Sequence, residues 1–318
     1  MKAAVVLGAG GFIGSHLVKR LKSEGYWVRG VDLKHPEYGM TEADDFVIAD
    51  LRDPLLMSSV VDQRYDEVYQ LAADMGGAGY INTGENDAEV LVNSALINLN
   101  LIKRIQEVEV GTVFYSSSAC VYPEGAQMES EVVPLVESLA YPAEPDSEYG
   151  WEKLFSERAY LTQAKNLGTR IRIARFHNIY GPEGTFTGGK EKAPAALCRK
   201  VAEATTEIEI WGDGEQTRSF LYIDECIEGI RRLMASDYDQ PINLGSDLLI
   251  SINDLARQIM AIADVDLRMD HIKGPQGVRG RCSDNTLIKE VLGWTPSSDL
   301  KSGLEITYQW IAKQVAAL

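Results

Sequence analysis

Apolar and amphipathic stretches alternate along the first half of the chain. Short apolar runs predict strands at residues 3–7, 27–31, 46–48, 67–71, 112–115 and 170–175. Longer stretches between them have apolar residues at helical spacing and predict helices at 12–23, 54–61, 85–107 and 148–165. Strands and helices in this alternation predict a parallel sheet covered by helices on both faces.

The pattern loosens after residue 176, where glycines and a proline interrupt the periodic stretches. We expect a helix from Ala193, strands at 218–223 and 241–244, and helices near 252–263 and 300–316. Two domains follow. Residues 1–176 form a nucleotide-binding domain to which the chain returns near 218–245, and residues 177–318 form mainly a smaller substrate-binding lobe.

A glycine-rich turn joins the first predicted strand to the first predicted helix. Glycines at 8, 11 and 14 permit a tight turn and bring backbone N–H groups close to a pyrophosphate at the helix N-terminus. Asp32 ends the second strand, where a carboxylate binds ribose hydroxyls and repels a 2′-phosphate, unless it only caps a helix. The expected fold is therefore a Rossmann-type, doubly wound α/β domain that binds NAD.

Other residues near strand ends are expected either to line this cofactor or simply to end their strands. The cofactor-binding set we predict is Gly8, Gly11, Phe12, Ile13, Gly14, Asp32, Asp50, Leu51, Leu71, Ala72, Ala73, Tyr149 and Lys153.

Composition narrows the possible partners. The 318 residues include 31 Lys and Arg against 47 Asp and Glu, a formal net charge of −16, which argues against nucleic-acid or anionic-membrane binding. No run reaches transmembrane length, and no metal-ligand spacing occurs. The four cysteines are widely separated, so we expect free thiols and a cytoplasmic protein.

Tyr149 and Lys153 lie four residues apart on a predicted helix and share one of its faces. An ammonium beside a phenol favours the phenolate, so we expect a lowered tyrosine pKa. Such a tyrosine takes a proton from a sugar hydroxyl while hydride leaves the same carbon. The pair alone is common on protein surfaces, but the glycine turn and Ser118, which follows a strand, favour a redox site.

These motifs resemble the extended short-chain dehydrogenase/reductase family of nucleotide-sugar epimerases and dehydratases, over nearly the whole chain. Longer segments resemble most closely its members that invert C3 and C5 of GDP-mannose: AADMGG (72–77), SSACVYP (117–123), RFHNIYGP (175–182), GGKEKAPAA (188–196), WGDG (211–214), QTRSF (216–220) and VRGR (278–281). Lys190 departs from the family pattern, which usually has arginine there, and predicts a weaker contact.

The resemblance implies a role for each matched residue. Tyr149 becomes the redox base with Lys153 as its partner, and Cys120 and Lys192 become the acid/base pair that inverts ring carbons. A transient ketone at C4 acidifies the protons at C3 and C5. The implied substrate contacts are Gly76, Ser118, Ala119, Cys120, Asn178, Glu191, Lys192, Ala193, Lys200, Gln216, Thr217, Arg218 and Arg281. The resemblance also implies a homodimer paired through helices 85–107 and 148–165.

The residues leave alternatives open. Lys192 precedes Pro194 in a predicted first helical turn, and the positive helix end should lower its pKa. It could instead pair with a phosphate, and Cys120 could be a buried structural thiol. A 4-epimerase would leave both residues unexplained, and a dehydratase would need an acidic pair where this chain has Ala119 and Cys120. A non-catalytic NAD-binding regulator would usually lack the tyrosine or the lysine.

Overall fold

Seven parallel strands form the central sheet of the chain, whose computed structural model describes residues 1–81, 83–128, 132–274, 277–296 and 299–317. The strands lie in the order β11 (Pro241–Leu244), β6 (Arg170–Phe176), β5 (Thr112–Ser118), β4 (Glu67–Gln70), β1 (Ala3–Leu7), β2 (Trp27–Asp32) and β3 (Asp45–Ile48). The strand order reverses at β1, and such a point opens a ligand-binding crevice at the carboxyl ends of the strands.

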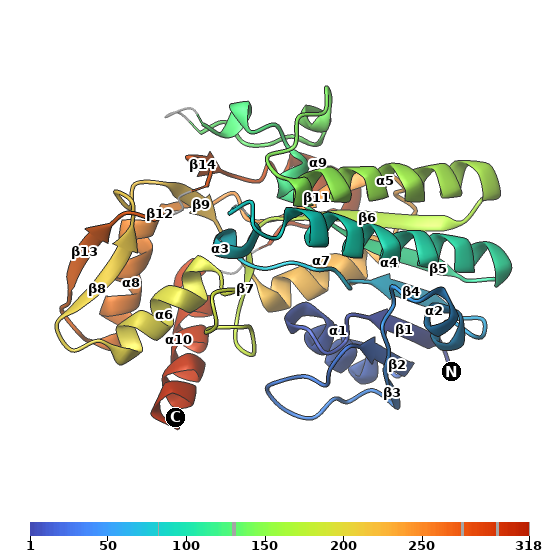
Figure 1. Cartoon of the computed structure of the whole chain (residues 1–318), viewed down its shortest axis with the longest axis horizontal. Helices are drawn as coiled ribbons and strands as arrows, with labels where there is room; N and C mark the ends of the chain where they lie inside the picture. Colours follow the sequence, from blue (N-terminus) through green and yellow to red (C-terminus); the bar gives the residue numbers. More distant parts are fainter. Residues whose placement is uncertain (82, 129–131, 275–276, 297–298, 318) are drawn as a thin grey trace.

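Helices cover both faces of this sheet (Figure 1). The helices on one face are α1 (Phe12–Ser23) and α7 (Ile223–Ala235); those on the other are α2 (Pro54–Val60), α4 (Asp87–Glu107) and α5 (Glu148–Leu167). Side chains alternate along each strand, so Val6 packs into the core under α1 while Val5 packs into the core under α4. Because both of its faces are covered, the central strand β1 is apolar throughout.

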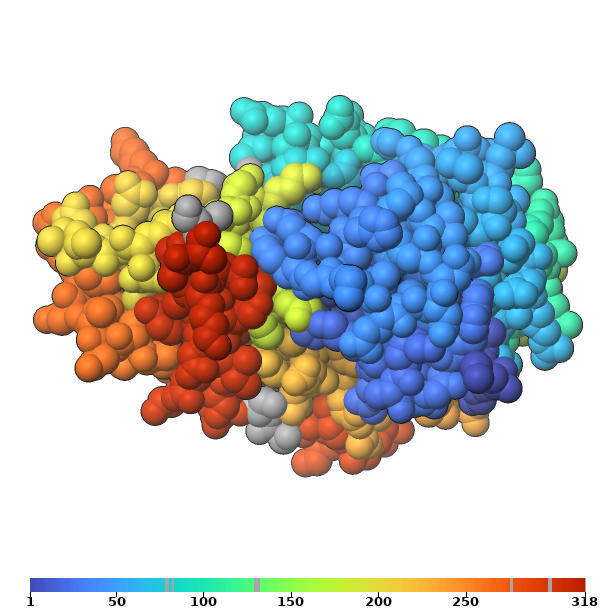
Figure 2. All heavy atoms as spheres, turned by 90° about the horizontal axis from the view of Figure 1, so that it is seen from below, coloured from blue at the N-terminus to red at the C-terminus, as the bar shows by residue number. Residues whose placement is uncertain are grey.

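The second half of the chain gathers mainly at one end of the molecule (Figure 2). There β8 (Glu207–Trp211) pairs in parallel with β13 (Arg268–Ile272), and β9 (Thr217–Ser219) lies between β12 (Leu249–Ser251) and β14 (Gly280–Arg281). The helices α6 (Ala193–Glu203), α8 (Ile252–Ala263) and α10 (Leu300–Ala316) pack together over these strands.

Short elements connect these parts. They are α3 (Ala78–Ile81), η1 (Ala119–Val121), η2 (Gly125–Gln127), η3 (Glu137–Ala140), the parallel pair β7 (Ile179–Tyr180) and β10 (Leu221–Tyr222), and α9 (Thr286–Leu292). No helix within the described ranges is long and apolar enough to cross a membrane.

The predicted doubly wound α/β sheet is confirmed, but one predicted strand is wrong. Residues 218–223 do not form a single strand, because the chain leaves β9 at Ser219, forms β10 at Leu221–Tyr222 and enters α7 at Ile223. The prediction also missed α7, although Cys226, Ile227 and Ile230 are apolar at helical spacing and buried. Helix α7 and β11 carry the chain back onto the sheet of the first half.

Candidate active site

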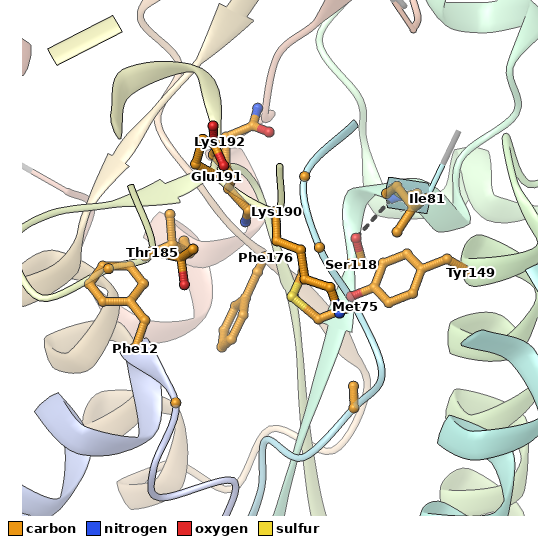
Figure 3. A pocket seen from close by; sticks show the side chains of 18 of the residues that line it. Phe12, Met75, Ile81, Ser118, Tyr149, Phe176, Thr185, Lys190, Glu191 and Lys192 are labelled. Carbon is orange, nitrogen blue, oxygen red and sulfur yellow. Dashed lines mark hydrogen bonds between the residues drawn. The ribbon is translucent and has the colours of Figure 1, made fainter. Parts of the chain in front are cut away.

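A continuous cleft of about 1530 Å³ runs along the carboxyl ends of the sheet strands and into the second-half lobe. Its walls come from the glycine turn after β1, the ends of β4 and β5, the start of α5, the loop before α6, and strands β8, β9 and β14. Figure 3 shows Ser118 and Tyr149 on one side and Lys190–Lys192 across from them. One continuous space therefore joins the glycine turn to the second-half lobe.

The glycine turn has the shape that a dinucleotide phosphate requires. Gly8 has φ +92°, and a Cβ there would lie 2.8 Å from the Ala72 backbone nitrogen. A Cβ on Gly14 would lie 2.0 Å from the Gly8 carbonyl, so only glycine lets α1 approach the turn this closely. Gly11, at the N-cap of α1, is exposed and lines the cleft together with Phe12 and Ile13. Backbone N–H groups at this helix end are free to face an anion.

Asp32 lies at the end of β2 and lines the same end of the cleft. Its carboxylate accepts hydrogen bonds from the backbone N–H of Gly10 at 2.9 Å and of Leu33 at 2.7 Å. A Cβ on Gly10 would lie 2.2 Å from the Lys34 carbonyl, so the turn and the acidic residue fit only around a glycine. The carboxylate retains lone pairs for ribose hydroxyls, and the residues present fit NAD.

The remaining predicted cofactor residues, Asp50, Leu51, Leu71, Ala72 and Ala73, also line the cleft. The Asp50 carboxylate accepts hydrogen bonds from Arg52 at 2.6–3.1 Å, and this partner lowers the pKa of Asp50. Arg52 and Asn93, which sequence reasoning missed, line this part of the cleft and are joined by a 3.0 Å hydrogen bond.

Tyr149 lies in the first turn of α5, directly beside Cys120. Ser147 caps this helix, and its Oγ accepts a hydrogen bond from the Gly150 backbone N–H at 3.2 Å. A Cβ on Gly150 would lie 2.1 Å from the Cys120 carbonyl oxygen. A glycine at this position therefore lets α5 pack closely against η1 and brings the phenol next to the thiol.

Lys153 lies one turn further along α5 and is buried. Its Nζ donates a hydrogen bond to the Ser116 carbonyl at 3.0 Å and lies 5.5 Å from the centre of the Tyr149 ring. The predicted lowering of the Tyr149 pKa is wrong for this structure. Burial raises that pKa above its usual value, the neighbouring Cys120 and Glu152 raise it further, and only the hydrogen bond with Ser118 opposes them. Burial likewise lowers the pKa of Lys153.

Cys120 lies in η1, and its sulfur is buried at the cleft wall. The Ser118 hydroxyl caps η1 by accepting the Cys120 backbone N–H at 3.2 Å (Figure 3). Burial raises the pKa of the Cys120 thiol, and Asp146 raises it further, whereas Arg281 lowers it.

Lys192 is the N-cap residue of α6, and the side chain enters the cleft from the other wall. Its pKa is lowered, as predicted, but the main cause is burial and not the helix end. Electrostatic coupling with Cys120 opposes this shift, so the amine and the thiol lie near enough to influence each other's protonation.

Most of the remaining predicted substrate residues line the cleft. They are Gly76, Ala119, Asn178, Glu191, Ala193, Lys200, Gln216, Arg218 and Arg281. Thr217 is the exception and a correction. Successive residues of a strand face opposite sides, so Thr217 lines a shallow depression behind β9, beside Leu249 and Ser251, while Arg218 faces the cleft.

Several predicted contacts already have partners within the chain. Arg218 donates hydrogen bonds to the Thr217 and Val278 carbonyls at 2.8 and 2.6 Å, and burial lowers its pKa to about 10. Lys200 Nζ donates to the Glu209 carbonyl at 2.8 Å. Lys190 Nζ lies 3.7 Å above the centre of the Tyr80 ring, so this lysine contacts an aromatic face across the cleft.

Two buried polar atoms of cleft residues have no hydrogen-bond partner. They are Oε2 of Glu191, which precedes Lys192, and Oε1 of Gln216, at the lobe end. Unpaired buried acceptors are costly, and a ligand that donates hydroxyl or amide hydrogens would satisfy them. Among the residues that the structure describes, no cluster of His, Cys, Asp or Glu could hold a metal ion.

Comparison with known proteins identifies relatives over almost the whole chain. GDP-mannose 3,5-epimerase from Arabidopsis thaliana is 49% identical over 315 residues, which cover 98% of this chain and 82% of the relative. GDP-mannose 3,5-epimerase 1 from Oryza sativa subsp. indica is 50% identical with the same coverage.

Solved structures share the fold. UDP-glucose 4-epimerase from Thermotoga maritima superimposes with a TM-score of 0.88 and 25% identity, covering 98% of this chain and 99% of that one. UDP-glucuronic acid 4-epimerase from Bacillus cereus, solved with UDP-glucuronic acid and NAD, gives 0.83 and 26% with the same coverage. The model of the NAD dependent epimerase/dehydratase family matches residues 4–245. With the glycine turn, Asp32 and the Tyr149–Lys153 pair around one cleft, the chain belongs to the NAD-dependent epimerase/dehydratase family.

Proposed function

We propose that this chain is a GDP-mannose 3,5-epimerase, which converts GDP-mannose to GDP-L-galactose, with GDP-L-gulose as the alternative product. The observation that carries the proposal is the presence of two further proton-transferring groups, Cys120 and Lys192, in the cleft that holds Tyr149 and Lys153. Relatives named for this activity share about half of the chain's residues over 98% of its length.

The first task of the site is to oxidise C4 of the hexose. NAD held by the glycine turn and Asp32 would supply the hydride chemistry at this carbon. Tyr149 takes the proton of the C4 hydroxyl, and Ser118, whose hydroxyl lies near the phenol, holds the reacting oxygen. Because burial raises the pKa of Tyr149, the phenol needs a nearby cation when it loses its own proton, and Lys153 is the candidate for this role.

The second task is to invert the neighbouring carbons. A ketone at C4 acidifies C3 and C5, and each inversion needs a base on one face of the ring and an acid on the other. Cys120 and Lys192 come from different walls of the cleft, and burial raises the thiol pKa and lowers the amine pKa towards each other. Burial thus favours a protonated thiol that can donate a proton and a neutral amine that can accept one, and each group contributes roughly 10²–10⁴-fold.

A 4-epimerase is the second candidate, because the solved relatives with the same fold are named 4-epimerases. That reaction exchanges hydride at C4 alone and gives Cys120 and Lys192 no task. A dehydratase would require an acidic side chain beside Ser118, where this chain has Ala119 and Cys120. The acid/base pair thus favours inversion at C3 and C5.

Incubation with GDP-mannose in D₂O, followed by NMR of the sugar, tests the proposal. We expect deuterium at C3 and C5 together with inverted product. Cys120→Ala should still transfer hydride to NAD, seen as absorbance at 340 nm, but should not give inverted product at the wild-type rate. Inversion at C4 alone, or loss of water, would exclude the 3,5-epimerase.

The outer face of α4 and α5 supports a homodimer. Five large apolar side chains are exposed there at helical spacing, between 41% and 50% of their surface: Val92, Leu96, Leu99, Trp151 and Phe155. The two helices pack side by side, so these residues form one apolar surface. We expect two copies to bury it as a four-helix interface. All four cysteines are free, which supports a cytoplasmic location.

A further inference from the structure

The guanidinium of Arg281 holds three side chains together at the wall of the cleft. Its Nη1 donates to the Cys120 sulfur at 3.4 Å, its Nε donates to Gln127 Oε1 at 2.6 Å, and its Nη2 donates to the Asp146 carboxylate. Arg281 is 9% exposed and Cys120 is 6% exposed, so these contacts are shielded from water. The N–H that reaches the sulfur is thus fixed by two oxygen acceptors.

Asp146 is placed to act on both Arg281 and Cys120. Its backbone N–H donates to the Cys120 carbonyl at 3.3 Å, and Ser147 Oγ donates to Asp146 Oδ1 at 2.8 Å, which leaves Oδ2 for the guanidinium. The carboxylate also lines the cleft. None of our sequence reasoning selected this residue, because it is 135 positions away from Arg281.

We propose that Asp146 is a positioning residue for Cys120: it anchors Arg281 so that Nη1 stays on the sulfur and stabilises the thiolate formed when Cys120 gives up its proton. The inference rests on the proposed role of Cys120 in proton transfer. Without the carboxylate only Gln127 holds the guanidinium, so the arginine side chain is fixed less firmly and Nη1 contacts the sulfur less often. The two charges act in opposite directions on the thiol, so the pair both orients the donor and limits how acidic the thiol becomes.

Other charged or titratable groups surround the sulfur and have to be held constant in any test. The groups facing Cys120 come from α5 and the segment that leads into it, the N-cap of α6, β9 and β14, and they are Asp146, Tyr149, Lys153, Lys192, Arg218 and Arg281. Single substitutions at Asp146 and Arg281 leave the other four in place.

The proposal is tested by alkylating Cys120 with iodoacetamide in the NAD-loaded protein at a series of pH values. The measured quantity is the midpoint pH of the curve of alkylation rate against pH. The thiolate displaces iodide and forms a C–S bond, so the rate follows the thiolate fraction. Arg281→Gln removes the cation and should raise the midpoint by about one pH unit, a roughly tenfold slower reaction at pH 7. Asp146→Asn removes the negative charge but keeps an oxygen acceptor for Nη2, so the midpoint should fall.

Asp146→Ala separates anchoring from charge. It removes the charge and the acceptor together, so the midpoint should lie above that of Asp146→Asn. Equal midpoints for the two variants would mean that Asp146 acts through charge alone and would overturn the proposal. In an Arg281→Gln background the two variants should become equal. If Asp146→Ala fails to fold, Arg281→Lys tests the same anchoring, because one ammonium cannot reach both the Asp146 carboxylate and the Cys120 sulfur. An alkylation midpoint equal to that of the wild type for Arg281→Lys would overturn the proposal.

Arg279→Gln is the matched control. Arg279 lies two residues from Arg281 and also pairs with an aspartate, Asp213 at 2.9 Å, but this pair is exposed and away from Cys120. Its alkylation midpoint should equal that of the wild type. Alkylation needs no sugar nucleotide, so its result does not depend on whether GDP-mannose is the substrate. The role of Asp146 and the proposed function can therefore fail independently. Mass spectrometry of the Cys120 peptide distinguishes it from the other buried thiols.

Discussion

Replacing Glu157 with glutamine should destabilise the protein strongly, because it breaks an ion pair in the core behind the site. Arg175 Nε and Nη2 donate to the two Glu157 oxygens at 2.9 and 2.8 Å, and Ser117 Oγ donates to the same carboxylate at 2.5 Å. The side chains are only 3% and 1% exposed. The pair ties β6 to α5 one turn after Lys153, and to β5 next to Ser118.

The size of the effect follows from burial. Removing one partner of a buried pair leaves the other charge unpaired in a dry environment and costs about 3–5 kcal/mol. For a chain of 318 residues, each kcal/mol corresponds to about 1.5 °C in melting temperature. We therefore expect Glu157→Gln to melt about 5–7 °C below the wild type.

Differential scanning calorimetry measures the melting temperatures of Glu157→Gln and of matched control variants. Glu207→Gln is the control, because Glu207 pairs with Arg268 at the surface, where the side chains are 46% and 70% exposed, and an exposed pair contributes about 0–1 kcal/mol. The double variant Glu157→Leu/Arg175→Met should melt closer to the wild type than Glu157→Gln, because no unpaired charge remains. If Glu157→Gln and Glu207→Gln melt within 1 °C of each other, the reasoning from burial is wrong.

Four further predictions concern the cofactor, the redox step, the assembly and pH. The protein should bind NAD more tightly than NADP, and Asp32→Ala should reduce the ratio of the two dissociation constants by at least about tenfold, measured by calorimetric titration. Tighter binding of NADP than of NAD by the wild type would contradict the role of Asp32. Tyr149→Phe should abolish C4 oxidation and all epimerisation while the melting temperature stays the same, and near-wild-type turnover would exclude Tyr149 as the base. Leu96→Glu should convert a dimer into a species of one chain mass, 35.1 kDa, in sedimentation experiments; a wild type that already sediments at that mass would refute the dimer. Burial lowers the pKa of His177 from 6.5 to about 3, so as the pH falls below 6.5 this residue is protonated in the unfolded chain but not in the folded chain. The His177→Asn variant should therefore lose less stability than the wild type between pH 6.5 and 4.5. Equal losses of stability in the two proteins over this range would contradict the prediction.

The nucleotide end of the molecule was predictable because its determinants are local in sequence. The turn from β1 into α1 requires glycine at positions 8 and 14, because α1 packs closely against the turn there. The spacing of these glycines is visible in the sequence. Asp32 was found from its place at the end of the second strand. Gly10 was not selected, because its close contacts with Asp32 and Lys34 arise only in the folded chain.

The second half was harder to predict because competing patterns overlap there. The apolar residues 220–223 suit a strand, but the chain leaves β9 at Ser219 and Ile223 already begins α7. The side of β9 that faces the cleft was equally hidden: it depends on the antiparallel register with β12, in which Arg218 lies opposite Ile250. A one-residue error in that register exchanges the sides of Thr217 and Arg218, and the resemblance of the segment at 216–220 to the family selected both residues without distinguishing their sides.

Protonation at the site depends on groups that no sequence motif joins. The Tyr149–Lys153 spacing predicts an acidic phenol, yet in the fold the Lys153 ammonium binds the Ser116 carbonyl while burial dominates at the phenol. Cys120 is surrounded by residues from four other segments, and one hydrogen bond to its sulfur comes from Arg281, 161 positions away. Motifs of adjacent residues therefore locate the chemistry of this family, whereas the acidity of each group is decided by long-range packing. A sequence that keeps Cys120 but loses Asp146 would match the same motifs and, on this argument, would hold a thiol of different acidity.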